Sequence, residues 1–182
     1  MQSNFTAIHV LRVWFVTVCL LAAGALAAAQ ADEKAATLKL EQIALNEGHI
    51  KGYLKVGPKL AKMFDRIDKA GDAPDDKLMA ELEALAKEGG FTSFDELETA
   101  VSNITFVMSG INEDDGTFRE PVDVLKQELA DTEADKELKG KDKAELVAAI
   151  KESIEHTPKL KHPGNVALVQ KHFKALVKLF EE

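Results

Sequence analysis

The stretch SGINEDDGTFREP, residues 109 to 121, places three acidic side chains and an asparagine next to a glycine. A calcium loop of the EF-hand type needs oxygen ligands at loop positions 1, 3 and 5, glycine at position 6 and a bidentate glutamate at position 12. With Gly116 at position 6, positions 1 and 12 fall on Ile111 and Val122, which offer no side-chain oxygen. We therefore interpret Asp115 and Gly116 as a turn, with glycine supplying the positive φ. Weak contact with a cation stays open.

Histidines suggest one candidate metal site. His156 and His162 flank a loop that contains proline, and Glu155 could act as a third ligand. No histidine pair has the i, i+4 spacing of a zinc protease, and the HEXXH motif is absent. Histidines in loops, such as these two, are more often solvated than bound to a metal. His172 lies beside the apolar stripe of the last expected helix, so we favour a packing role for it. We predict no metal site, with His156, His162 and Glu155 as the weak alternative.

Groups for nucleophilic catalysis are not assembled in any recognised motif. No serine lies in a GxSxG elbow, and no glycine pattern typical of phosphate binding is present. Adjacent carboxylates fall at expected helix starts and solvated faces. Asn103-Ile104-Thr105 matches a glycosylation acceptor, but its place inside an expected helix beside an apolar residue argues against modification. We predict no catalytic residue and no cofactor, and an enzyme with carboxylates and histidines drawn from separate helices remains the alternative.

The C-terminal segment has an asymmetric charge. Between Glu155 and Glu181 there is no acidic residue, while five lysines occur. At about 100° per residue, Lys171, Lys174 and Lys178 fall within about 60° of one another, opposite an apolar stripe. One interpretation is a solvated face whose lysines are favoured by the helix dipole. The other is a contact for an anionic component of the cell envelope, such as lipid headgroups or an acidic polymer.

Residues 1–31 have the pattern of a cleaved signal peptide. Arg12 precedes the apolar run VWFVTVCLLAAGALAAA, and small residues precede the acidic start at Asp32. Cleavage after Ala31 fits best, and cleavage after Ala27 or Ala29 fits almost as well. An uncleaved anchor is the competing interpretation, because seventeen apolar residues approach the ~17–25 needed for a membrane span. The pattern predicts export to the periplasm and no membrane-spanning segment after processing.

The remaining residues, 32–182, are expected to form one helical domain. They contain no cysteine, so the mature domain would depend on a packed core rather than on disulfides. They carry 22 basic and 31 acidic residues, a formal net charge of −9, which disfavours nonspecific nucleic-acid binding.

Apolar residues recur at helical spacing almost throughout, and the alternation typical of strands is absent. A first helix is expected over residues 35 to 56, with Gly57-Pro58 as an interruption before a second helix. Gly89-Gly90 should end a third helix, and Ser93 with Glu96 fits a capping box that opens a fourth. Pro121 should restart a helix, which a break near LKGKD separates from the next, and a last helix should contain Val166 to Phe180. The prediction is an all-α, irregular helical bundle of about six or seven helices.

Three stretches carry a resemblance: GGFTSFDELETAVSNITFVMSGINEDDGTFREP, ADKELKGKDKAELVAAI and GNVALVQKHF. They resemble a group of uncharacterised, small helical proteins of proteobacteria that bear signal peptides and have no assigned function. The resemblance implies a periplasmic location and a helical fold, and it implies no activity. We expect an exported, non-catalytic protein that binds a partner or small ligand, with an enzyme or an envelope stress chaperone as alternatives.

Overall fold

A computed structural model describes residues 40–70 and 75–180, with the side chains of residues 68–70 left aside. The expected signal peptide, residues 1–31, and its three cleavage positions lie outside this part. The described residues form six α-helices and a short 3₁₀-helix, with no β-strand, so the all-α prediction is confirmed. The helices are α2 (Glu47–Ala70), α3 (Asp76–Gly89), α4 (Phe94–Met108), α5 (Pro121–Ala134), α6 (Gly140–His156), α7 (Gly164–Val177) and η1 (Lys178–Phe180).

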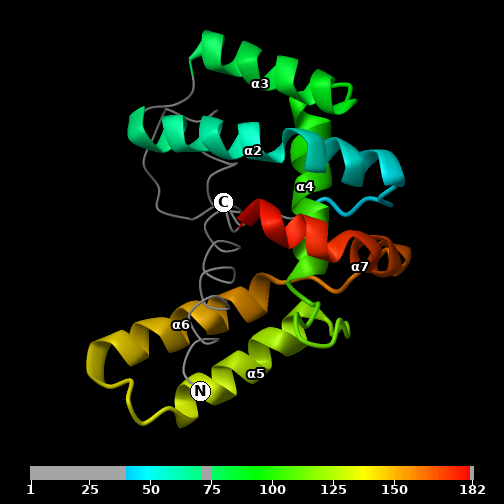
Figure 1. Ribbon diagram of the computed structural model, residues 1–182. Coiled ribbons are helices and arrows are strands. Elements are labelled where there is room, and N and C mark those ends of the chain that lie inside the picture. Colours follow the sequence, from blue (N-terminus) through cyan, green and yellow to red (C-terminus); the bar gives the residue numbers. More distant parts are fainter. Residues whose placement is uncertain (1–39, 71–74, 181–182) are drawn as a thin grey trace.

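Helix α4 is the centre of the arrangement. It runs across α2 and α7, while α3 lies on α2 and the α5–α6 hairpin lies at the other end of the molecule (Figure 1). One face of α4 is inaccessible to solvent, because Leu97, Ala100 and Ile104 recur at helical spacing and are fully buried. Residues of α2, α3 and α7 pack against this face and complete the apolar core.

The predicted interruption at Gly57-Pro58 is wrong, because α2 continues without a break through Pro58. A proline inside a helix removes one backbone hydrogen bond and costs about 3 kcal/mol. Pro58 itself lies on the exposed side of α2, while Val56 and Leu60 on either side of it are buried in the core. Burial of these flanking side chains favours a continuous helix despite the proline.

The start of the predicted first helix is also wrong, because residues 40–46 are not helical and α2 begins at Glu47. Ile43 directs both its N–H and its C=O toward the helices that it crosses, as a residue in a β-strand does. The bonds that hold this segment come from side chains of α4 and α7, far away in sequence. We call residues 40–46 the extended segment.

The predicted helix ends around Gly90 and Ser93 are confirmed. Gly90 has a φ of 90°, which ends α3 in the left-handed region that glycine enters without strain. Ser93 Oγ accepts a hydrogen bond from Glu96 N at 3.2 Å and so caps α4. The other half of the capping box differs, because Glu96 Oε2 accepts from Thr92 N at 2.7 Å instead of from Ser93 N.

The α5–α6 hairpin packs mainly on itself. The predicted break near LKGKD is confirmed, since α5 ends at Ala134 and α6 begins at Gly140, where φ is 64°. The buried residues of α5 and α6 are Pro121, Thr132 and Ile150. The hairpin therefore lacks an apolar core comparable to that around α4.

Candidate functional site

Residues 109–120 form a tight turn, as predicted. Gly116 has a φ of 70°, and Gly116 N donates a hydrogen bond to Asn112 O at 2.8 Å. Asp115 Oδ1 accepts from Thr117 N and Thr117 Oγ1, which lowers the pKa of the Asp115 carboxyl. An antiparallel bridge between Ile111 and Phe118 closes the base of the turn. The local side-chain bonds of Asp115 are those of a turn residue.

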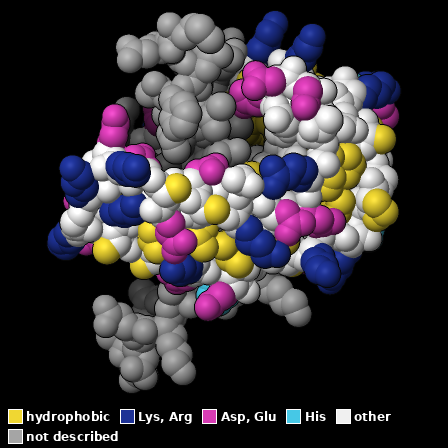
Figure 2. All heavy atoms as spheres, turned by 90° about the horizontal axis from the view of Figure 1, so that it is seen from below, with side chains coloured by type: hydrophobic (Ala, Val, Ile, Leu, Met, Phe, Trp, Pro, Cys, Tyr) yellow, Lys and Arg dark blue, Asp and Glu magenta, His cyan; other side chains and the backbone are white. Residues whose placement is uncertain are grey.

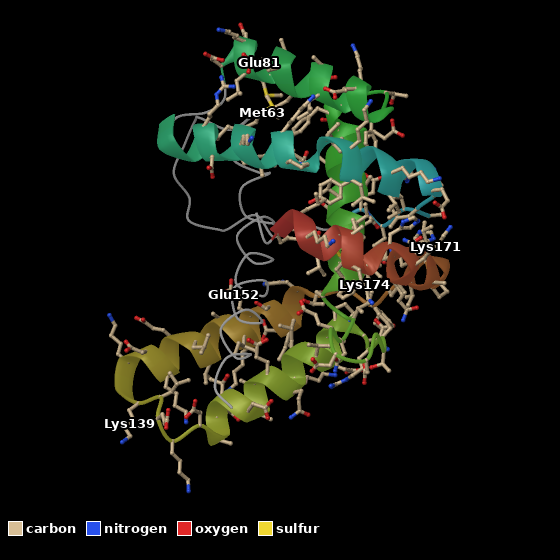
Figure 3. All side chains as sticks on the ribbon, in the orientation of Figure 1. Met63, Glu81, Lys139, Glu152, Lys171 and Lys174 are labelled. Atoms are coloured by element: carbon tan, nitrogen blue, oxygen red, sulfur yellow. The ribbon has the colours of Figure 1, made fainter. Side chains whose placement is uncertain are left out.

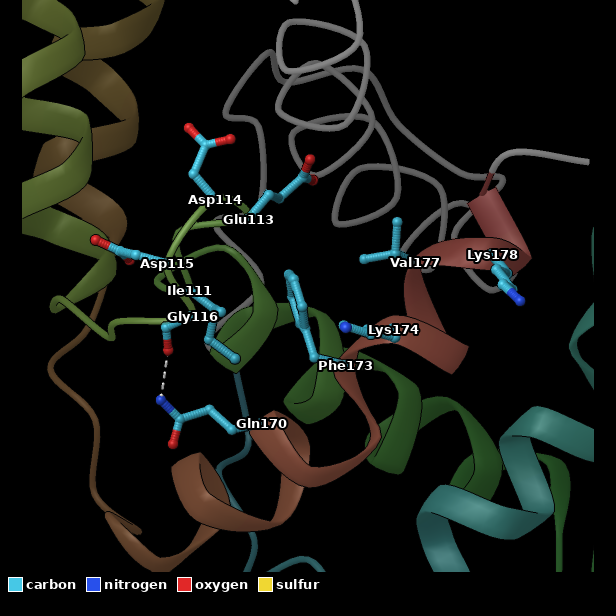
Figure 4. A pocket seen from close by; sticks show the side chains of 10 residues that line it. All are labelled: Ile111, Glu113, Asp114, Asp115, Gly116, Gln170, Phe173, Lys174, Val177 and Lys178. Carbon is cyan, nitrogen blue, oxygen red and sulfur yellow. Dashed lines mark hydrogen bonds between the residues drawn. The ribbon is translucent and has the colours of Figure 1, made fainter.

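An open hollow of about 560 Å³ lies between this turn and helix α7 (Figure 4). Its volume is within the range of about 300–1,000 Å³ usual for small-molecule sites. Apolar side chains of Ile111, Phe173 and Val177 line part of it. Gln170 Nε2 donates a hydrogen bond to Gly116 O at 2.8 Å, which fixes the turn against α7. Two segments more than fifty residues apart in sequence thus make one concave surface.

Charges of both signs surround the hollow. Carboxylates lie on the turn and ammonium groups lie on the side of α7 and η1 (Figure 4). Within the described part of the chain, four of the five charged side chains make no hydrogen bond or ion pair: Glu113, Asp114, Lys174 and Lys178. They are exposed and keep their hydration, so a ligand could contact them without first breaking an internal ion pair.

Lys171 does not belong to this hollow. Its ammonium group pairs with the Glu47 carboxylate at the first turn of α2. Lys171 and Lys174 accordingly lie at different places along α7 (Figure 3). The predicted basic face of Lys171, Lys174 and Lys178 is therefore divided between an internal contact and the hollow.

Glu47 connects the first turn of α2 to α7. Lys171 holds the pKa of the Glu47 carboxyl below its ordinary value of 4.5, and His172 Nε2, which lies 3.1 Å from Glu47 Oε2, lowers it further. The contact is exposed, so water screens it, but it joins two helices that also pack through the core. The same carboxylate is favoured by the positive end of the α2 dipole.

We expect Glu47 to contribute to stability only while it is ionised. Because its pKa is lower in the folded than in the unfolded protein, its contribution is present above about pH 4.5 and is lost as the pH falls through the folded-state pKa. Urea unfolding of Glu47→Gln and of the parent chain should therefore differ at pH 6 and converge near about pH 3. Glu137→Gln, at an exposed side chain without an ion pair among the described residues, is the control. If the free energies of unfolding of Glu47→Gln and the parent chain differed by the same amount at pH 6 and near about pH 3, this role of Glu47 would be contradicted.

The candidate metal ligands are not assembled. His162 Nε2 lies 3.0 Å from Gln42 O, in contact with the extended segment, and Glu155 and His156 are exposed at the end of α6. Within residues 40–70 and 75–180, no group of three or more histidine, cysteine or acidic side chains is arranged to hold a metal ion. The weak alternative of a site at Glu155, His156 and His162 gains no geometric support.

Two histidine–carboxylate pairs occur away from the hollow. His172 pairs with Glu47, and His49 Nε2 lies 3.7 Å from Glu96 Oε1. His49 also stacks on Phe91, with 6.1 Å between the ring centroids. No histidine is found among the described residues that line the hollow. The enzyme alternative would need histidines and carboxylates to converge on a concave site, and these two pairs do not lie in this one.

Asn103, the formal glycosylation acceptor, is only 2% exposed. Both atoms of its carboxamide are hydrogen-bonded inside the protein. The expectation that it lies within a helix beside the core is confirmed, and in the folded protein its side chain is not accessible to a modifying enzyme.

The sequence patterns indicated Lys174, Lys178 and the 109–121 stretch separately, and they gave no sign that these line one hollow, with Lys174 directed toward the turn (Figure 4). The helical spacing of apolar residues also gave no sign that Asn103 and Asn165 hydrogen-bond to the extended segment. The one available signal was polarity at Asn103, an asparagine inside an expected helix next to an apolar residue, whereas Asn165 fell in the loop expected before the last helix.

In the part of the chain that the structure describes, no helix has the length and apolar character that a membrane span requires. The chain matches no known family model, no curated protein and no solved structure.

Proposed function

We propose that the protein is an exported, non-catalytic helical protein that binds a small ligand in the bacterial envelope, with the hollow between α7 and the 109–120 turn as its site. The observation that carries this proposal is a set of charges that have no partner among the described residues and that surround an apolar lining. The signal-peptide pattern of residues 1–31 supports the export part of this proposal.

The charges favour an amphoteric ligand with an apolar body. Among the described residues, three carboxylates and two lysines line the hollow and give it a formal charge of about −1. A polyanion such as an acidic polymer would meet repulsion from Glu113, Asp114 and Asp115. A small molecule with one anionic and one cationic end would meet a complementary group at each end, while its apolar part covered Phe173 and Val177. Of the anionic envelope component considered from the sequence, this proposal keeps only one feature, an anionic group of the ligand that binds near Lys174 and Lys178.

Calorimetric titration with the dipeptide leucyl-leucine tests this class of ligand. This dipeptide carries an ammonium and a carboxylate on an apolar body, and N-acetyl-leucyl-leucinamide keeps the body without either charge. We expect the free dipeptide to bind about 2- to 30-fold more tightly, because two exposed ion pairs contribute about 0.2–1 kcal/mol each.

Lys174→Gln combined with Lys178→Gln should weaken binding of the free dipeptide and leave the capped dipeptide unaffected. Lys159→Gln combined with Lys161→Gln makes the same change in net charge outside the hollow and serves as the control. Equal affinities for the free and capped dipeptides would contradict an amphoteric site, and equal binding by both double variants would contradict its location.

Export is tested separately by intact-mass measurement of the protein from the envelope fraction. A processed product beginning near Asp32 is expected. A full-length species that stays with the membranes would support the uncleaved anchor instead.

One observation favours the chaperone alternative. Over the α5–α6 hairpin, hydrophobic side chains lie among lysines and acidic residues (Figure 2), and Leu146 is 37% exposed. An envelope stress chaperone would offer such a surface to unfolding clients. It should suppress aggregation of a model client, and Leu146→Glu should weaken that effect. Equal aggregation with and without a molar excess of the protein would exclude this alternative.

A further inference from the structure

The extended segment lies on a surface where two buried asparagines bind its main chain, and we call this surface the groove. Asn103 on α4 and Asn165 in the first turn of α7 are 2% and 3% exposed. Asn103 Oδ1 accepts from Ile43 N at 3.0 Å, and its Nδ2 donates to Glu41 O at 2.7 Å. Asn165 Oδ1 accepts from Leu45 N at 2.8 Å, and its Nδ2 donates to Ile43 O at 2.8 Å.

The two carboxamides act as peptide groups of a neighbouring strand would. Each one bridges the C=O of one residue and the N–H of the residue two positions later, which is the pattern of hydrogen bonds along one edge of a β-strand. These four bonds involve only main-chain atoms of the extended segment. The groove therefore recognises an extended backbone, as sites that bind peptides by strand addition do.

Sequence preference comes from Gln42 and Leu45. Gln42 Nε2 donates to Lys159 O at 2.9 Å, and Gln42 Oε1 accepts from Lys161 N at 2.8 Å. The side chain of Leu45 packs against the apolar core. Glu41 and Ala44, in contrast, are exposed. The groove thus fits an extended backbone with glutamine three positions before an apolar side chain.

Without the segment, Asn103 Oδ1 and both amide atoms of Asn165 would lose the partners they have here, while Asn103 Nδ2 would keep Thr99 O, so water or another backbone would have to replace the lost bonds. The extended segment precedes α2 and contributes mainly polar contacts, so it can leave the groove without unpacking the apolar cluster apart from Leu45. The sequence that fits best is already present in every copy of the chain.

We infer that this groove is a binding site for an extended polypeptide in trans, and that its occupant is the extended segment of a second copy. In a monomer the chain's own segment occupies the groove, because tethering gives it an effective concentration of the order of mM. When that segment is displaced, the segment of another copy makes the same bonds and links the two molecules by exchange.

Two complementary variants test this inference in the full chain expressed with its own leader. Gln42→Ala with Ile43→Pro removes both side-chain bonds of Gln42 and the N–H that Asn103 accepts, and it leaves the groove intact. Asn103→Ala with Asn165→Ala disables the groove and leaves the segment intact. Sedimentation velocity should show each variant as a monomer alone and a heterodimer when the two are mixed at about 100 µM. Two folded variants that stay monomeric after mixing would overturn the inference.

A peptide provides a second test that does not depend on either variant folding. The seven-residue peptide LEQIALN, equal to residues 40–46, should bind the unaltered chain weakly and saturably, and should change the side-chain amide NMR signals of Asn103 and Asn165. Proline in place of the isoleucine should weaken binding at least about 10-fold, because one N–H donor is lost. No binding of LEQIALN would overturn the inference. Equal binding of a scrambled peptide would show a general peptide site and would overturn the assignment of a second copy as the occupant.

Discussion

Replacing Asn103 by alanine is expected to lower the free energy of unfolding by about 2–4 kcal/mol, a fall of about 5–15 °C in Tm. The side chain is buried, and it accepts from Ile43 N while donating to Glu41 O and Thr99 O. Alanine would leave main-chain groups of the extended segment without partners in a part-buried site. Loss of a partner for such groups costs about 1–3 kcal/mol each.

Chemical denaturation of the variant and of Ser102→Ala measures this effect. Ser102 is the neighbouring residue on α4 and is half-buried, and its hydroxyl makes no hydrogen bond with the described residues. We expect Ser102→Ala to change stability by less than about 0.5 kcal/mol. An equally small effect of Asn103→Ala would show that the extended segment is not anchored as described.

Replacing Gly52 by alanine is expected to destabilise the protein by about 2–3 kcal/mol. A Cβ at this position in α2 would lie 2.4 Å from Gly89 O and 2.7 Å from Phe91 Cε2. The carbonyl oxygen belongs to the backbone at the end of α3, so it cannot move aside as a flexible side chain would. In an open helical position the same change would stabilise by up to about 1 kcal/mol, and here the steric overlap outweighs that gain.

Gly164→Ala is the matched control, because a Cβ on Gly164 in the first turn of α7 would meet nothing within 4 Å. Thermal unfolding should show an unchanged or slightly higher Tm for Gly164→Ala and a clear decrease for Gly52→Ala. If Gly52→Ala were as stable as the parent chain, the close approach of α2 to the end of α3 would be contradicted.

The chemistry of single residues was sufficient to predict where helices end and begin around Gly90 and Ser93. Gly90 and Ser93 act within a few residues of themselves, since one relieves backbone strain and the other pairs a neighbouring amide. The turn at Gly116 follows for the same reason. These features need no knowledge of what packs against them.

Features that depend on distant partners could not be read in this way. The apolar spacing of Leu45 and its neighbours suggested a helix, yet the bonds from Asn103 and Asn165 make this segment extended. At Pro58 a strong local signal for a helix end is outweighed by burial of Val56 and Leu60. In both cases tertiary contacts outweigh local propensity.

At the candidate site, too, local features were predicted correctly and contacts with distant residues were not. Helical periodicity correctly placed Lys174 and Lys178 away from the buried face of α7. It grouped them with Lys171, because spacing alone contains nothing about Glu47, more than a hundred residues away. It also gave no sign that Glu113 and Asp114 would lie across a hollow from these lysines.

The central claim is that the hollow between α7 and the 109–120 turn binds an amphoteric ligand, and NMR titration of the labelled chain with leucyl-leucine tests it most directly. We predict saturable shifts of backbone amide signals within residues 109–118 and 170–178, and much smaller shifts with the capped dipeptide. Absence of saturable shifts with the free dipeptide, or shifts confined to other parts of the chain, would contradict the claim.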